Sequence, residues 1–139
     1  MYLEQVEKID AIVEGKLIEQ RQWKELALNI TANMEGERVQ SSSATTSKME
    51  DAVIQCLMVE EQISEEVKRL IARKQDVVRT IESLYNPTEY RILHMRYIRY
   101  IPFDDIAVQM DKDYSWVTTT HGRAVRHVQD ILDKEKNNG

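Results

Sequence analysis

The chain has 139 residues, of which 31% are charged and 6% aromatic, and it contains four glycines and two prolines. This composition is typical of long solvated helices and argues against a β-rich fold. The one cysteine, Cys56, cannot form an intramolecular disulfide, and no apolar run approaches the roughly 18 residues of a membrane span. The first ten residues are polar and acidic, unlike a signal peptide. We therefore expect a cytoplasmic protein with no membrane partner.

The first part of the chain predicts two long helices. Apolar residues recur at three- and four-residue spacing over residues 2–34, as they do on one face of a helix. Residues 35–46 lack this periodicity and are rich in Ser and Thr, so we expect a flexible connection there. A capping box from Ser47 to Glu50 then marks the start of a helix that reaches about Tyr85.

The second of these helices carries a coiled-coil seam, because its apolar positions alternate four and three residues apart without a break. Two seam positions, Glu60 and Lys74, are charged. At 1.5 Å per residue this helix would be about 55 Å long, so it needs a partner. The partner is either residues 2–34, folded back as an antiparallel hairpin, or another copy of the chain. The seam consists of Met49, Val53, Cys56, Glu60, Ile63, Val67, Leu70, Lys74, Val77, Ile81 and Leu84.

The charge is distributed unevenly. The net charge is −5, and residues 1–85 carry all of it, with 11 basic and 16 acidic residues. Residues 86–139 carry eight of each and are neutral. We divide the chain accordingly into a helical coiled-coil arm, residues 1–85, and a C-terminal domain, residues 86–139.

The C-terminal domain opens with a clear helix start. Asn86 can cap, Pro87 suits the first helical position and Glu89 the third. The helix should continue to about Tyr97, with one face formed by Tyr90, Leu93 and Tyr97. Residues 98–101 then make a turn.

Residues 102–125 have the pattern of a helix-turn-helix, a pair of helices whose second member can enter a DNA major groove. Ala107 is the small residue where the two helices cross, and Val117 is placed to pack back onto it. Asp113 stands where a side chain can cap the second helix. The first helix adds two apolar residues, Ile106 and Met110.

Two turn positions depart from the usual helix-turn-helix pattern. Asp111 stands where glycine is commonest, and Lys112 stands where a small apolar residue is usual. Because Asp tolerates left-handed backbone geometry better than most residues, we expect the turn to be kept. The second helix should continue to about Lys134.

Several stretches of this domain resemble region 4 of bacterial sigma factors: YRILHMRY at 90–97, IPFDDIA at 101–107, WV at 116–117 and GRAV at 122–125. That family has an L-x-x-R-Y helix, two acidic residues followed by I-A, and a basic-Ala-apolar end to its recognition helix. The resemblance covers about residues 86–132. With its acidic coiled arm, the whole chain is similar to small sigma-region-4-like transcriptional regulators of Gram-positive phages and prophages.

The resemblance places four base-facing residues at the start of the second helix: Tyr114, Ser115, Thr118 and Thr119. Sigma factors often have Arg or Glu here, whereas Ser and Thr discriminate poorly among bases. Basic residues are the candidates for phosphate contacts, namely Arg123 and Arg126, with Lys112, Arg96 and Arg99 as outlying candidates. We interpret Trp116, next to an apolar valine, as a core residue.

No pattern in the sequence indicates chemistry. The three histidines, His94, His121 and His127, lack the spacing of a metal site and have no Cys or carboxylate to complete one. There is no Gly-rich phosphate loop, no nucleophile elbow and no carboxylate pair that looks buried. We therefore expect no enzyme activity, no cofactor and no metal.

These features together predict an all-α protein with an N-terminal antiparallel helical hairpin or coiled-coil arm and a C-terminal sigma-region-4-like helix-turn-helix domain. The expected function is sequence-specific binding of duplex DNA and regulation of phage or prophage transcription. We expect a homodimer through residues 47–85, because pairing two weak binders raises their affinity for one site. Two alternatives remain: a DNA-packaging adaptor like a phage terminase small subunit, or a protein-interaction module that contacts RNA polymerase.

Overall fold

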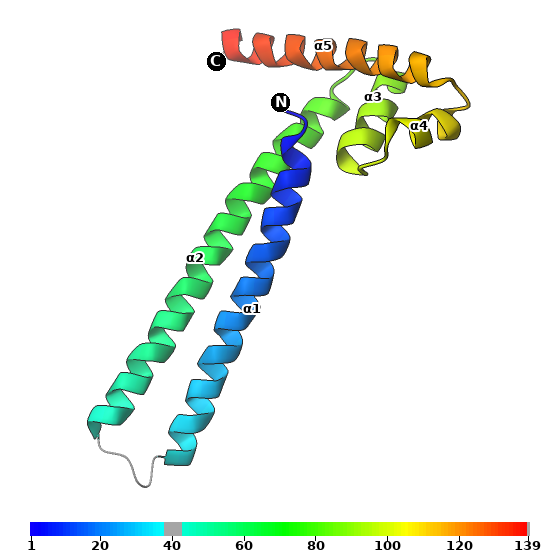
Figure 1. The fold of residues 1–139 in the computed structure, drawn as a ribbon. Helices are drawn as coiled ribbons and strands as arrows, with labels where there is room; N and C mark the ends of the chain where they lie inside the picture. Colours follow the sequence, from blue (N-terminus) through cyan, green and yellow to red (C-terminus); the bar gives the residue numbers. More distant parts are fainter. Residues whose placement is uncertain (38–42, 139) are drawn as a thin grey trace. The chain divides into compact units, whose positions relative to one another are not determined.

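The computed structural model describes residues 1–37 and 43–138, and in these residues the protein is all-α, as the sequence predicts (Figure 1). None of the helices in these residues has the length and apolar character needed to cross a membrane. The elements are α1 (Gln5–Glu37), α2 (Ser43–Glu82), α3 (Pro87–Leu93), the π-helix η1 (His94–Ile98), α4 (Phe103–Met110) and α5 (Tyr114–Asn138).

The helices α1 and α2 form an antiparallel hairpin (Figure 1). Their contacts run in opposite chain directions, because residues further along α1 contact residues earlier in α2. Gln20 Nε2 donates to the Glu60 carbonyl at 3.0 Å and to Ser64 Oγ at 2.6 Å, and Lys16 forms an ion pair with Glu66. The partner of the long second helix is therefore the first helix of the same chain.

The predicted seam supplies much of the buried face of α2. Six of its residues are buried: Cys56, Ile63, Val67, Val77, Ile81 and Leu84. Of its two charged positions, Lys74 donates through Nζ to Asp10 Oδ1 of α1 at 2.8 Å. An interruption of the apolar seam is thus matched by a carboxylate on the facing helix.

The connection between α1 and α2 is shorter than residues 35–46, which the sequence predicts for it. Residues 35–37 continue α1, and residues 43–46 already belong to α2, which begins at Ser43 and not at Ser47. Residues 38–42 lie outside the described residues. Residues 43–46 contain neither glycine nor proline, so nothing in them stops a helix from extending back from the capping box.

By packing, the chain divides into two compact units. The hairpin unit is Ala11–Ile71, and the head unit is Met1–Asp10 together with Ala72–Gly139. The division at residue 86 stays a prediction about the roles of the two parts, because the packing boundary falls elsewhere and joins the first ten residues to the C-terminal helices.

Two apolar clusters make the core of the head unit. The first brings together the start of the chain, the end of α2, α3, η1 and α5, through Leu3, Val6, Val77, Ile81, Leu84, Leu93, Tyr97, Ala124 and Val128. The second lies under the helix-turn-helix and contains Ile92, Met95, Ile106, Ala107 and Val117. The two clusters cover different stretches of α5, so both ends of its buried face are fixed.

Candidate nucleic-acid interface

The helix-turn-helix is formed by α4, a turn at residues 111–113, and α5 (Figure 1). Ala107 is 7% exposed and Val117 is fully buried, and both belong to one apolar cluster with Ile106. A small residue on α4 faces a β-branched one on α5, which lets the two helices approach closely. Burial of both residues in one cluster agrees with the predicted crossing at Ala107.

The turn is built by two aspartates. Asp111 has left-handed backbone angles, φ 53° and ψ 47°, as the sequence predicts. Its neighbour Lys112 donates its backbone N–H to the Ala107 carbonyl at 3.0 Å, while the Asp111 N–H donates to Val108 at 3.2 Å, the pattern of a Schellman helix end. Asp113 Oδ1 accepts the Trp116 N–H at 2.7 Å and caps α5.

The helix α5 has a buried face and an exposed face. The buried face is apolar except for one threonine and recurs every three or four residues, at Val117, Thr120, Ala124 and Val128. The predicted DNA-contacting residues Ser115, Thr119, Arg123 and Arg126 are exposed, as are Tyr114 and Lys112 at the turn. The structure thus brings the predicted set together on the outer side of one helix.

Some members of that set are partly engaged within the protein. Thr118 is half-buried, and its hydroxyl donates to the Ser115 carbonyl at 3.1 Å. The Tyr114 ring lies edge-to-face against Phe103, with ring centroids 6.4 Å apart. Lys112 Nζ lies 5.2 Å from the centre of the Trp116 ring. These contacts orient the start of α5 without covering it.

The roles of Trp116 and Arg96 differ in part from the sequence interpretation. Trp116 packs against the second apolar cluster but is only half-buried, because its ring lies near the surface beside Lys112. Arg96, an outlying phosphate candidate, is stacked over Phe103 at 4.4 Å from the ring centre, and its Nη1 is 3.5 Å from the Ile101 carbonyl. Arg99, the other such candidate, is exposed.

Each of the three histidines contacts a different partner. Tyr97 and His121 Nε2 are hydrogen-bonded at 2.7 Å, His127 pairs with the buried Glu89, and the His94 ring is 5.6 Å from that of Tyr90. Burial and the nearby charge of Arg96 lower the pKa of His121 below its ordinary value. Within residues 1–37 and 43–138 no group of three possible ligands could hold a metal ion.

Gly122 is a further residue on this side of α5, and the base- and phosphate-contact candidates do not include it. It lies half-exposed on α5, on the same side as Ser115, Thr119 and Arg126, and a Cβ added there would meet no atom within 4 Å. A glycine inside a helix lowers stability and here has no packing reason. Its position in the middle of a helical pattern is the signal that could have found it.

The protein is thus all-α, with a long helical hairpin followed by a helix-turn-helix whose second helix has an exposed face. The chain belongs to the family described as "Protein of unknown function (DUF1492)", which matches residues 30–132. The match includes all of α4 and residues 114–132 of α5. No curated protein and no solved structure matches the chain.

Proposed function

We propose that this protein binds duplex DNA through the exposed face of α5 and regulates transcription of phage or prophage genes. The observation that carries the proposal is the order of side chains along that face. Small hydroxyl residues stand at the start of the helix, at Ser115 and Thr119, and Arg123 and Arg126 follow one to three turns later. A recognition helix contacts base edges with its first residues and can reach phosphates further along.

The resemblance to sigma region 4 supports the same proposal. Its quoted stretches fall on α3 and η1, on α4, and on α5, the elements that pack together beneath the proposed interface. The two departures in the turn are accommodated, since Asp111 adopts the left-handed geometry and Lys112 closes the end of α4. Because the resemblance to sigma region 4 also implies contact with RNA polymerase, we include that contact in the proposal.

We further propose that the protein acts as a homodimer. Residues 86–139 are electrically neutral, so a single copy should bind DNA weakly, and linking two copies raises their joint affinity. Because α1 faces the seam of α2, a second copy would pack on outward faces of the hairpin unit. Large apolar side chains are exposed there, at Ile12, Leu17, Ile18, Leu26, Leu28, Ile54, Leu57, Met58 and Ile71.

The test is fluorescence-anisotropy binding of the full chain to a pool of random duplexes, at about 50 and 200 mM salt. The variant Arg123→Ala/Arg126→Ala removes two proposed phosphate contacts. The control Arg21→Ala/Lys24→Ala removes the same charge at the same spacing from an exposed face of α1. We expect the first variant to bind more weakly. The slope of its log affinity against log salt concentration should fall by about two, because two phosphate contacts are lost. The control should bind like the unaltered protein.

Three results would contradict the proposal. One is a folded protein that binds no duplex at either salt concentration. The second is an equal loss of affinity in both variants, which would indicate a non-specific charge effect. A protein that captures RNA polymerase without binding any duplex would support the interaction-module alternative. The mass of the assembly in light scattering separates a dimer from the closed ring of a packaging adaptor.

A further inference from the structure

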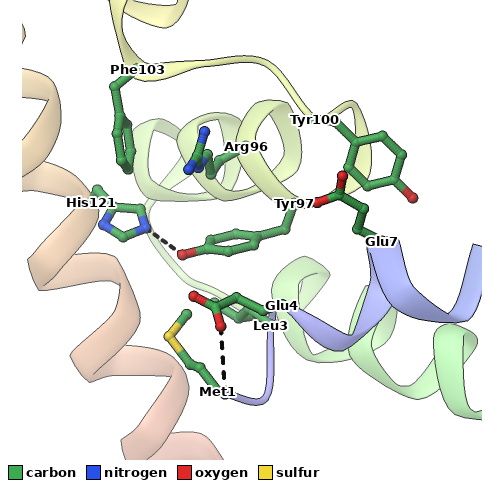
Figure 2. Close-up of a pocket in the computed structure, with 9 residues that line it drawn as sticks. All are labelled: Met1, Leu3, Glu4, Glu7, Arg96, Tyr97, Tyr100, Phe103 and His121. Atoms are coloured by element: carbon green, nitrogen blue, oxygen red, sulfur yellow. Dashed lines mark hydrogen bonds and ion pairs between the residues drawn. The ribbon is translucent and has the colours of Figure 1, made fainter.

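One recess of the head unit is occupied by contacts among its own lining residues (Figure 2). Arg96 and His121 both lie against the Phe103 ring, and Glu4 forms an ion pair with the Met1 ammonium group at 3.6 Å. A second recess, of about 450 Å³, lies where the end of α2 and the start of α3 meet the later part of α5. It differs from the first because a fully exposed aromatic side chain stands at its rim.

This aromatic residue is Tyr85, the most exposed of the large apolar side chains among the described residues. Its backbone is held on both sides, because Leu84 before it is buried in the first apolar cluster and Asn86 after it caps α3. The ring therefore projects into water from a fixed segment, so little further ordering is needed when a partner covers it. A single exposed aromatic is ordinary, but here a recess lies beside it.

The recess combines apolar and polar surface. Leu84 and Ile131 supply the apolar part, and a hydrogen-bonded pair, Glu89 with His127, supplies the polar part. The Glu89 side chain is 3% exposed and that of His127 is 49% exposed, so the pair can be reached through the histidine. A tyrosine matches this combination, because its ring is apolar and its hydroxyl needs a hydrogen-bond partner when buried. The recess thus suits the kind of side chain that stands at its own rim.

A projecting group and a matching recess on the same patch are what a two-fold contact between identical chains requires. Tyr85 is fully exposed and so does not fill the recess of its own chain. In a two-fold pair, Tyr85 of each copy would enter the recess of the other, and both rings would be covered at once. A second copy of this chain therefore fits the patch.

The charges at the rim fit the same symmetry. Asp130 and Lys134 both line the recess, are exposed and lie four residues apart on α5. Neither forms an ion pair within residues 1–37 and 43–138. When two copies of one helix meet antiparallel across a two-fold axis, Asp130 of each can lie opposite Lys134 of the other. The two resulting ion pairs would fix the register of the contact more than its strength.

We propose that two copies of this protein associate through this patch, with Tyr85 of each chain in the other chain's recess and its hydroxyl bonded to the Glu89–His127 pair. An aromatic anchor in a pocket is the usual centre of such an interface. The contact uses none of the proposed DNA-contacting residues. It rests on the proposed homodimer in requiring self-association, and it adds to that homodimer a contact outside the hairpin unit.

The experiment is sedimentation equilibrium of the full chain between about 1 and 100 µM, without DNA. Tyr85→Ala should raise the dissociation constant about thirtyfold, the loss typical of an aromatic anchor. Tyr85→Phe should raise it only about fivefold, because the ring stays and one hydrogen bond is lost. The control is Val108→Ala, which should change nothing, since Val108 is 80% exposed in the same unit and does not line the recess.

Charge reversal tests the two-fold register. Asp130→Lys and Lys134→Asp should each weaken association about tenfold, because like charges then meet across the axis. The double variant Asp130→Lys/Lys134→Asp should restore it, since opposite charges face each other again. Such a recovery cannot come from misfolding of the single variants. A double variant as weak as the single ones would overturn the proposed contact.

The outcomes separate this contact from the proposed homodimer. Self-association that Tyr85→Ala leaves unchanged would overturn the contact between head units and leave the homodimer through the hairpin unit standing. A chain that stays monomeric up to about 100 µM would overturn both.

Discussion

The two compact units bury their side chains very differently. The head unit has two apolar clusters formed by residues of five α-helices and the π-helix η1, with Ile92, Leu93, Ile106 and Val117 fully buried. Among the described side chains of the hairpin unit, the buried apolar residues are Ala27, Cys56, Ile63 and Val67. Two helices alone form a single contact line, so most of each helix surface stays in water. The hairpin unit therefore depends more on helix propensity and on polar pairs such as Lys16 with Glu66.

This difference can be measured region by region, because each unit contains one tryptophan. Trp23 lies in the hairpin unit and Trp116 in the head unit, and both are half-buried. The variant Trp116→Phe leaves only the hairpin reporter, and Trp23→Phe leaves only the head reporter. Coincident urea transitions from the two would indicate one cooperative unit, and separate transitions would indicate two.

Truncation of a core side chain should have the largest effect on the free energy of unfolding. Leu93→Ala in the head unit removes a fully buried side chain from a multi-helix cluster and should lower the free energy of unfolding by about 2–5 kcal/mol. Ile63→Ala in the hairpin unit should cost about 2 kcal/mol or less, because a two-helix layer can relax around the gap. Urea titration of both variants checks this. Equal losses would mean that the hairpin unit is packed as tightly as the head.

Loss of a cap should have the next largest effect. Asp113→Ala removes the acceptor for the Trp116 N–H and should lower stability by about 1 kcal/mol. Asp113→Asn keeps an acceptor and should lose much less. In a protein with two separate transitions, only the one followed by Trp116 should shift. A shift of the Trp23 transition as well would show that the two units unfold together.

Replacing a helical glycine should change stability less, and the two units should differ in how the change affects DNA binding. Gly15 in the hairpin unit and Gly122 in the head unit both lie inside helices, and a Cβ at either would meet open space. Each Gly→Ala change should therefore stabilise its unit by about 0.5–1 kcal/mol. If α5 approaches DNA closely, Gly122→Ala should weaken duplex binding although it stabilises the fold, and Gly15→Ala should not. Unchanged duplex binding in both variants would contradict a close approach of DNA to Gly122.

The pH dependence should be the smallest effect, since the groups are partly exposed. Burial works to raise the pKa of Asp10, but hydrogen bonds from Lys74 and Tyr100 outweigh it, so the pKa lies below its ordinary 3.8. The hydrogen bond and charge of Lys16 lower the pKa of Glu66 from 4.5. Groups with lowered pKa values stabilise the fold above their unfolded values, and that stability is lost as pH falls through the folded ones.

Both units should thus lose stability below about pH 4. Asp10→Asn should reduce the acid sensitivity of the head unit, and Glu66→Gln should reduce that of the hairpin unit. Melting followed through the single-tryptophan proteins between neutral and acid pH checks each in turn. A stability that rises on acidification would show that the sign is wrong.

The features that the sequence predicted correctly are local. The cap at Asn86, which accepts from Thr88 and Glu89, the left-handed Asp111 and the cap at Asp113 each depend on residues within a few positions. Helix periodicity likewise located the seam of α2, six residues of which are buried. The residues that determine such features lie within one or two helical turns of each other, so the features can be predicted from a single sequence.

The features that it did not predict join distant segments. The Glu89–His127 pair spans 38 residues and the Tyr97–His121 pair spans 24, and no spacing rule relates them. Arg96 was a phosphate candidate by charge, but its stacking on Phe103 depends on the π-helix, for which the sequence has no clear signal. The pocket lined by Glu4, Arg96, Phe103 and His121 could not be predicted for the same reason, because its walls come from segments that are far apart in the sequence.

The inclusion of the first ten residues in the head unit has a consequence for how the protein folds. Leu3 and Val6 must meet Val77 and Ile81 across the 61 residues of the Ala11–Ile71 insert. Closing so long a flexible loop would carry an entropic cost that grows with the logarithm of its length. Pairing of α1 with α2 as a hairpin removes much of that cost, because each added turn brings Asp10 and Lys74 closer together. Folding of the hairpin unit thus brings the first ten residues to the end of α2, where they complete the first apolar cluster. A short turn in place of the hairpin unit could do the same in a minimal version of the protein.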